Sequence, residues 1–300
     1  MSKGWNGRKP AGRIAYVDGR YMPHGSAGVH IEDRGLQLGD AVYEVCGVSD
    51  GRLMDEAEHL DRLERSLRAI EIALPMPRPA LALVMRETVR RNGVRNGLLY
   101  LQISRGVARR DHPIPKVSPR PSLVLTVRSV PAGEFEKRRQ DGVTVITRPD
   151  ERWARRDIKT VQLLPNLLAK TAARRAGAYE AWLVDDAGLV TEGSSTNAWI
   201  VDAEGNLRTR PLGNDILPGV TRRVIVEAAE VAQLPIAQLP FSVAEALNAR
   251  EAFISSATGI MPVTGIDGRR VGDGKPGPVT RRVQELYGLT SAGRAAKSGT

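Results

Sequence analysis

A lysine and a glutamate far apart in the chain have side chains that could together perform amine chemistry. Lys159 stands just before the apolar run 161–164. An amine held near apolar walls is a candidate nucleophile that forms a Schiff base with a carbonyl group. Glu192 ends an expected strand within a run of small polar residues, and a buried carboxylate there needs a cationic partner or a proton. Either residue alone is more often a solvated surface charge.

A candidate anion site completes this set. The segment 217–221 has the sequence Leu-Pro-Gly-Val-Thr and leads directly into an expected helix. The first turn of a helix presents unpaired backbone N–H groups and the positive end of the helix dipole, and Thr221 adds a hydroxyl donor. An ordinary Pro-Gly turn capped by threonine is the common alternative. A second such site is expected near Ser256 and Thr258. A Schiff-base lysine, a partner for a ring nitrogen and an anion site are what pyridoxal phosphate requires.

The chain resembles the fold-type IV aminotransferases that use pyridoxal phosphate, and within that group the D-amino-acid aminotransferases. The likeness runs from about Ala15 to Tyr287. It is carried by Glu32-Asp33-Arg34-Gly35, Gly39-Asp40-Ala41-Val42-Tyr43-Glu44, Glu58-His59-Leu60-Asp61-Arg62-Leu63, Asp157-Ile158-Lys159, Thr191-Glu192-Gly193-Ser194-Ser195 and Leu217-Pro218-Gly219-Val220-Thr221-Arg222.

The resemblance implies a role for each matching residue. Lys159 would form the Schiff base with the cofactor and then move the proton between the substrate Cα and the cofactor C4′. Glu192 would pair with the pyridine nitrogen and keep it protonated. Arg62 would bind the phosphate, for which the planar guanidinium is well suited. The expected cofactor-binding residues are Arg62, Glu192, Leu217, Val220, Thr221, Ser256 and Thr258. No metal is expected.

The loop 106–115 lies between two expected strands, and its residues favour the D-amino-acid subfamily. In D-amino-acid aminotransferases an Arg-x-His pair on this loop comes from the neighbouring subunit and joins a tyrosine to bind the substrate α-carboxylate. Arg110, His112 and Tyr43 match these three residues. The resemblance therefore implies a homodimer in which this loop reaches the neighbouring subunit's site. A basic surface loop is the alternative. The run 254–263 is one residue shorter than in the family it resembles, which bears on the contacts expected of Ser256 and Thr258.

Composition excludes several other classes of protein. The 300 residues are 41% hydrophobic and 26% charged, as in a globular protein. The chain has no apolar segment long enough for a membrane span and no apolar leader, so the expected compartment is the cytoplasm. The single cysteine, Cys46, is expected to be a small buried residue. The formal charge of +10 does not by itself indicate nucleic acid, since aromatic residues make up only 4%. No nucleic-acid or membrane partner is expected.

The expected elements arrange into an α+β fold. Asp18-Gly19 and Asp50-Gly51 each separate two β-prone runs and predict hairpins. Apolar spacing predicts helices over about 55–73, 79–92, 164–176, 222–232, 243–249 and 277–287. By resemblance, the chain is a two-domain protein with an N-terminal α/β sandwich and a C-terminal pseudobarrel. The expected boundaries are a flexible N-terminus 1–12, a small domain 13–130, a linker 131–134, a large cofactor-binding domain 135–289 and a disordered tail 290–300.

The predicted activity is ping-pong transfer of an amino group from a D-amino acid, such as D-alanine or D-glutamate, to a 2-oxo acid. A branched-chain L-amino-acid aminotransferase and a 4-amino-4-deoxychorismate lyase are the alternatives on the same fold. An (R)-amine side activity is a further one. From other classes, a basic nucleic-acid-binding protein and a cofactor-carrying module without turnover are alternatives, and the complete set of catalytic residues argues against both.

Overall fold

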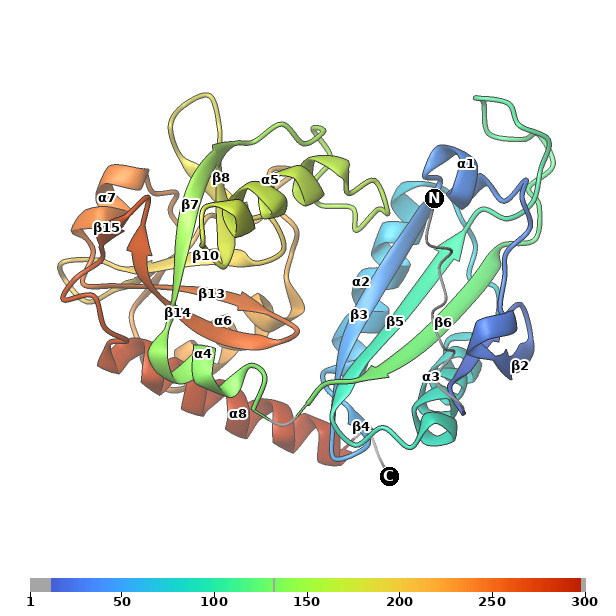
Figure 1. Cartoon of the computed structure of the whole chain (residues 1–300), viewed down its shortest axis with the longest axis horizontal. Helices are drawn as coiled ribbons and strands as arrows, with labels where there is room; N and C mark the ends of the chain where they lie inside the picture. The colour runs from blue at the N-terminus through green and yellow to red at the C-terminus, as the bar shows by residue number, and fades with distance from the viewer. Residues whose placement is uncertain (1–11, 132, 298–300) are drawn as a thin grey trace, which may run out of the picture. The chain divides into compact units, whose positions relative to one another are not determined.

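The computed structural model describes residues 12–131 and 133–297. The chain divides after Val130 into two compact units, Met1–Val130 and Pro131–Thr300, and Figure 1 shows the elements of both. The N-terminus predicted to be flexible, 1–12, lies outside the described residues except for Gly12. Residues 298–300 of the predicted tail also lie outside them.

A six-stranded antiparallel sheet forms the centre of unit 1. Its strand order is β2-β1-β6-β5-β3-β4. Asp18 and Asp50 occupy the two predicted hairpin turns with positive φ values of 45° and 48°, a conformation that Asp tolerates better than most residues. The strands are β1 (Ile14–Val17), β2 (Arg20–Pro23), β3 (Ala41–Ser49), β4 (Arg52–Leu53), β5 (Gly97–Ser104) and β6 (Ser122–Ser129).

Two long helices bury one face of this sheet. The helices of unit 1 are η1 (His24–Ser26), α1 (Arg34–Leu38), α2 (Glu56–Ala69) and α3 (Arg78–Asn92). Helix α2 packs against β3, and α3 packs against β1 and β6. The leucine stripe of α2 is buried, as its spacing predicted, at Leu60, Leu63 and Leu67. Cys46 is buried, as expected.

A nine-stranded mixed sheet forms unit 2. Its order is β12-β11-β10-β13-β14-β7-β8-β9, with β15 paired to β14. The terminal strand β9 also contacts β10, so the sheet curls into a half-barrel. The strands are β7 (Val143–Pro149), β8 (Glu180–Val184), β9 (Val190–Gly193), β10 (Asn197–Val201), β11 (Leu207–Arg208), β12 (Ile236–Ala237), β13 (Glu251–Ser256), β14 (Gly259–Ile266) and β15 (Arg269–Arg270).

Aromatic pairs fill the cores of unit 2. Trp182 meets Phe241 edge to face at a centroid distance of 5.8 Å, and Trp199 stacks on Phe253 at 5.3 Å. The second pair lies in the core where α6 packs against β13 and α8 packs against α6. The helices are α4 (Glu136–Asp141), α5 (Leu164–Arg175), α6 (Val220–Val231), α7 (Val243–Asn248) and α8 (Pro278–Lys297).

The C-terminal segment corrects one prediction. Composition indicated a disordered tail from residue 290, whereas α8 continues to Lys297. The segment 291–297 contains three alanines, the residue with the highest helix propensity, so it can extend a helix that already packs on α6.

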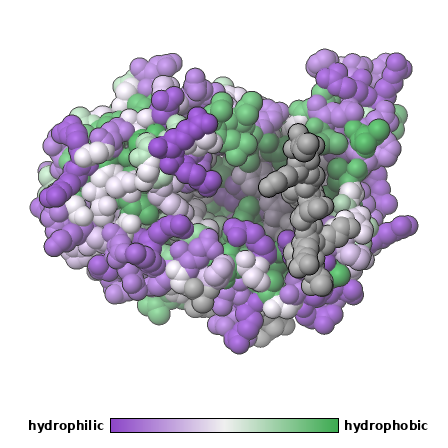
Figure 2. Space-filling view, viewed as in Figure 1, coloured by the Kyte–Doolittle hydropathy of each residue, from purple (hydrophilic) through white to green (hydrophobic). Residues whose placement is uncertain are grey.

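The fold class predicted from the resemblance is confirmed, since the structure combines helices with an antiparallel sheet in unit 1 and a curled mixed sheet in unit 2. Among the residues that the structure describes, no helix is long and apolar enough to cross a bilayer. Hydrophilic residues cover much of the face shown in Figure 2.

Candidate active site

Glu192 is the buried carboxylate at the end of β9. Its side chain accepts hydrogen bonds from Arg152 Nη1 at 2.5 Å, from Asn197 Nδ2 at 2.9 Å and from the backbone N–H of Leu217 at 3.0 Å. Burial raises the pKa of Glu192, while the Arg152 guanidinium acts in the opposite direction. Three donors, one of them a cation, therefore bind this single buried carboxylate. A buried acidic group with a shifted pKa and specific partners is typical of a functional site.

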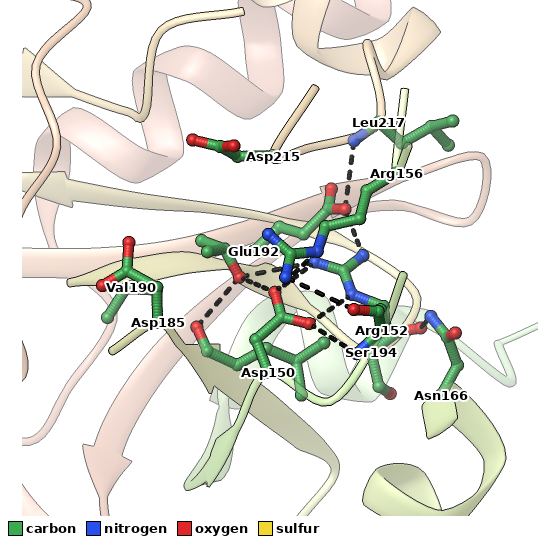
Figure 3. A network of polar contacts seen from close by, with 12 residues as sticks. Asp150, Arg152, Arg156, Asn166, Asp185, Val190, Glu192, Ser194, Asp215 and Leu217 are labelled. Atoms are coloured by element: carbon green, nitrogen blue, oxygen red, sulfur yellow. Dashed lines mark hydrogen bonds and ion pairs between the residues drawn. The ribbon is translucent and has the colours of Figure 1, made fainter. Parts of the chain in front are cut away.

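Arg152 links Glu192 to a second buried carboxylate, as Figure 3 shows. Its guanidinium binds Asp150 through two hydrogen bonds, Nε–Oδ1 at 2.9 Å and Nη2–Oδ2 at 2.8 Å. The hydroxyl of Thr191 donates to Asp150 Oδ2 at 2.7 Å. Burial alone lowers the pKa of Arg152, but its bonds to Asp150 and Glu192 outweigh that effect and raise it. Arg152 is therefore a fixed cation beside Glu192.

Asn197 connects Glu192 to the start of α6. Its amide also donates to the Leu217 carbonyl at 3.0 Å. A Cβ atom added to Gly219 would lie 2.0 Å from Asn197 Oδ1, so glycine at 219 is required by this close approach and not by a positive φ. Gly219 was predicted from the sequence as part of the candidate anion site. Asn197, Asp150 and Arg152 were not predicted as neighbours of Glu192.

The first turn of α6 joins the two anion sites predicted from the sequence. The helix begins at Val220 after Gly219, and within the described residues no side chain caps it. The Thr221 hydroxyl donates to the backbone carbonyl of Ser256 at 2.9 Å. The hydroxyls of Ser256 and Thr258 are 2.8 Å apart. An uncapped helix start beside three hydroxyl groups is a cradle that suits a phosphate.

Lys159 lies in the connection between β7 and α5, in the same unit as Glu192 and the start of α6. Its side chain is half-buried, and its neighbours Ile158 and Thr160 are buried. The assignment of Lys159 as the reactive amine remains a prediction.

A second buried glutamate holds the turn that follows Glu192. Glu180 in β8 accepts hydrogen bonds from the hydroxyls of Ser194, Ser195 and Thr196, the second at 2.7 Å and the third at 3.4 Å. Lys170 of α5 pairs with the same carboxylate at 3.1 Å. Because these contacts fix the turn between β9 and β10, they also fix the direction of the strand end that carries Glu192. No local pattern indicated a role for Glu180, since its partners are 10 to 16 residues away in the chain.

Arg62 is engaged by a carboxylate of its own unit. Its Nε and Nη2 donate to the two oxygens of Glu44 at 2.8 and 2.7 Å, and His59 Nδ1 lies 2.8 Å from the same group. Burial would raise the pKa of Glu44, but the charge and hydrogen bonds of Arg62 outweigh it and hold that pKa well below its ordinary value. Arg62 therefore has a fixed orientation on α2. Its assignment to a phosphate stays a prediction.

The predicted substrate residues also belong to unit 1. Tyr43 precedes Glu44 in β3 and so points to the opposite face of the sheet, where its ring stacks on Tyr100 with centroids 5.7 Å apart. Burial, with a smaller effect of Tyr43, raises the pKa of Tyr100 to about 12. Arg110 and His112 are exposed on the loop between β5 and β6.

The structure thus brings one part of the predicted site together by direct contact and leaves the other part in unit 1. The joined residues, all in unit 2, are Glu192, Leu217, Val220, Thr221, Ser256 and Thr258. The residues of unit 1 are Tyr43, Arg62, Arg110 and His112.

Comparisons with known proteins identify the family of this chain. Residues 41–266 match the family model described as amino-transferase class IV. A D-alanine aminotransferase from Bacillus licheniformis is 40% identical over 283 residues, covering 94% of this chain and 98% of the relative. A D-alanine aminotransferase from Staphylococcus haemolyticus is 38% identical over 275 residues, covering 91% and 95%.

A solved structure shares the fold at 27% identity. It is described as a hypothetical aminotransferase from Mycobacterium tuberculosis in a PLP-bound form, with a TM-score of 0.81 over 94% of this chain and 99% of that one. The family match covers both the strand that carries Tyr43 and the elements that carry Lys159, Glu192 and Thr221. The resemblance drawn from the sequence motifs is confirmed, and the chain belongs to the class IV aminotransferases.

Proposed function

We propose that this aminotransferase moves an amino group from a D-amino acid to a 2-oxo acid, with pyridoxal phosphate as its cofactor. The proposal is supported by the D-alanine aminotransferases that are 38–40% identical over more than nine-tenths of the chain. The two half-reactions follow each other in a ping-pong order, with pyruvate or 2-oxoglutarate as the acceptor.

The residues of unit 2 fit this cofactor. The uncapped start of α6, with Thr221, Ser256 and Thr258 around it, would hold the phosphate. Glu192 would face the ring nitrogen, since burial raises its pKa even beside Arg152 and a second cationic group would favour its charged form. Leu217 would pack on the ring. When bound, pyridoxal phosphate supplies an electron sink for the charge that develops at the substrate Cα.

Lys159 is the proposed catalytic residue. Its amine would hold the cofactor before substrate arrives. In the first half-reaction the amine would move a proton from the substrate Cα to the cofactor C4′, and in the second it would move a proton in the opposite direction, onto the Cα of the new amino acid. The cation Arg152 and the donor Asn197 keep Glu192 in one orientation during this transfer. Arg62, fixed by Glu44, would add a guanidinium to the phosphate site.

Tyr43, Arg110 and His112 would bind the substrate carboxylate and thereby set its handedness. A guanidinium and an imidazole recognise a carboxylate by charge and by hydrogen bonds. Fixing the carboxylate on the side opposite the lysine decides which Cα hydrogen faces Lys159. Arg110 and His112 are exposed on their own unit, as expected of side chains that reach the site of a neighbouring subunit.

The surface of α5 supports a homodimer. This helix turns its small residues Ala169 and Ala173 inward, whereas Leu164, Leu167 and Leu168 are 67%, 59% and 60% exposed. An ordinary surface helix has the opposite arrangement, with leucines inward. Figure 2 shows an apolar patch over α5. Apolar groups gathered in this way mark an interaction surface, and a second copy of the chain is the proposed partner.

The observation that carries the proposal is Glu192, buried between Arg152 and the backbone at the start of α6. The test is a single half-reaction on purified protein loaded with the cofactor. D-alanine or D-glutamate is expected to convert its absorbance to that of the pyridoxamine form, and L-leucine or L-glutamate is not. Lys159→Ala is expected to abolish the conversion.

Conversion by the L-amino acids alone would refute the proposal and favour a branched-chain enzyme. Conversion by neither would favour the lyase or an amine substrate.

A further inference from the structure

Arg34 is a buried arginine that contacts the loop carrying Arg110 and His112. It is the first residue of α1 and is only 3% exposed. Its Nη1 donates to the backbone carbonyl of Asp111 at 2.7 Å, and its Nη2 donates to that of His112 at 3.4 Å. One guanidinium therefore holds two consecutive carbonyl groups of this loop.

Arg34 is itself fixed by a shared carboxylate. Its Nε donates to Asp40 Oδ2 at 2.9 Å, and Arg105 binds the same carboxylate through two hydrogen bonds of 2.7 and 3.0 Å. Burial raises the pKa of Asp40, but the hydrogen bonds from Arg105 and Arg34 outweigh it and lower that pKa. Arg105 also donates to the carbonyls of Ile70 and Glu71, just past the end of α2. This chain of contacts connects α2 to the loop through Arg105, Asp40 and Arg34.

In the described ranges, backbone hydrogen bonds to the rest of unit 1 hold the first residues of the loop but not residues 109–115. The N–H of Arg34 donates to the Gly106 carbonyl at 3.0 Å, and that of Ala108 donates to the Glu32 carbonyl at 3.3 Å. Beyond these contacts, within the described part of the chain, Arg34 supplies both hydrogen bonds that join residues 109–115 to the rest of unit 1. The orientation of Arg110 and His112 therefore depends on Arg34.

We propose that Arg34 is a positioning residue for substrate specificity: by holding the carbonyls of Asp111 and His112, it sets the direction in which Arg110 and His112 meet the carboxylate of the amino acid. The proposal rests on the function proposed above for these two side chains. Arg34 acts through the loop backbone and does not itself touch the substrate. Its removal affects substrates that have a carboxylate and spares those that lack one.

Arg34→Gln and Arg34→Lys test this role. Asp40 keeps both hydrogen bonds from Arg105 in either variant, so no buried carboxylate loses all its partners and the fold is retained. Lysine restores the charge near Asp40 but, being a point charge on a flexible chain, does not hold two carbonyls in fixed directions. The matched control is Arg86→Gln, which removes a two-bond arginine pair with Glu56 elsewhere in the same unit.

Two measurements on the cofactor-loaded protein follow these variants. The first is amide hydrogen exchange and tryptic cleavage in the loop 106–121, which contains Arg109 and Arg110. The second is KM and kcat for D-alanine, compared with the rate for an (R)-amine that lacks a carboxylate. We expect faster exchange and cleavage in both Arg34 variants. We also expect KM for D-alanine to rise about 10-fold to 100-fold, as small misplacements of binding groups do. The rate with the amine and the properties of Arg86→Gln stay close to wild type.

An unchanged loop in the Arg34 variants would overturn the inference, as would a loosened loop with an unchanged KM for D-alanine. Arg110→Ala separates this failure from that of the proposed function. If Arg110→Ala raises KM and Arg34→Gln does not, the positioning role is wrong and the carboxylate site stands. If Arg110→Ala leaves KM unchanged, the proposed carboxylate site itself is wrong.

Discussion

Replacing Arg152 with methionine removes the cation shared by two buried carboxylates. Arg152, Asp150 and Glu192 have side chains that are 9%, 0% and 5% exposed. Removing one partner from a buried ion pair costs about 3–5 kcal/mol, because the remaining charge is left uncompensated. Asp150 keeps the Thr191 hydroxyl and an ion pair with Arg156 at 3.5 Å, and Glu192 keeps two N–H donors. We therefore expect a loss near the lower limit, about 3 kcal/mol.

This loss corresponds to a fall in Tm of roughly 6–12 °C, since 1 kcal/mol shifts Tm by about 2–4 °C for a unit of this size. The assay is thermal unfolding followed by circular dichroism at a fixed cofactor concentration, because a bound ligand also shifts Tm. Arg155→Met is the control, since Arg155 pairs with Asp157 while 43% exposed, and its Tm is expected to stay close to wild type.

The pKa shifts of Asp150 and Glu192 predict how the stability of the protein depends on pH. In the wild type the pKa of Asp150 is lowered, so its contribution to stability is present above its unfolded pKa and is lost as pH falls through the folded value. The pKa of Glu192 is raised, so its contribution is present below the unfolded pKa and is lost as pH rises through the folded value. Without Arg152 both folded pKa values rise, because the cation no longer favours the charged forms.

The loss of Tm in Arg152→Met relative to wild type is therefore expected to be largest near pH 8. It should become smaller toward pH 5, because the two carboxylates take up protons in the folded state. Asp150→Asn in the same background removes the charge that Arg152 no longer neutralises, of which the longer ion pair with Arg156 compensates only part, and should recover part of the loss. If the Tm of Arg152→Met lies within about 2 °C of wild type at pH 8, or if the Tm difference does not change with pH, Arg152 does not have this role in the network.

Three further substitutions test other parts of the structure. Gly219→Ala places a methyl group 2.0 Å from Asn197 Oδ1; we expect a loss of about 1–3 kcal/mol and weaker cofactor binding in an absorbance titration, whereas Gly213→Ala, with nothing within 4 Å, should change neither. Phe241→Ala empties a fully buried position and should lower the free energy of unfolding by about 3–5 kcal/mol in urea titration; a smaller loss would mean that the core collapses around it. Leu167→Asp charges the exposed face of α5 and should convert dimers to monomers in light scattering; an unchanged dimer would place the interface elsewhere.

Local sequence patterns predicted most of the elements correctly. Asp18 and Asp50 take the positive φ values that their Asp-Gly pairs indicated. The helix predicted over 164–176 runs over Leu164–Arg175, and Pro165 stands in its first turn. These features depend on residues close together in the chain, so a short window contains the information. The prediction of a disordered tail from residue 290 was wrong, because composition does not show that α8 packs against α6.

The network around Glu192 was not predictable in the same way. Arg152 and Glu192 are 40 residues apart, and Leu217 lies 25 residues beyond Glu192. Arg152 lies in a stretch that also contains Arg155 and Arg156, and nothing in the sequence separates the buried arginine from the others. Only the pairing of β7 with β8 and of β8 with β9 places Arg152 beside Glu192.

Short sequence motifs were sufficient to predict the chemical groups of this protein, namely the lysine, the glutamate and the helix start, and to indicate the family. This was possible because residue types and short spacings are read directly from the chain. Which groups share a partner could be established only from the tertiary structure. It placed Arg152 and the Leu217 N–H on one carboxylate, and it gave Arg34 the carbonyls of a loop 77 and 78 residues away. Such contacts depend on strand order and burial, which no local window contains.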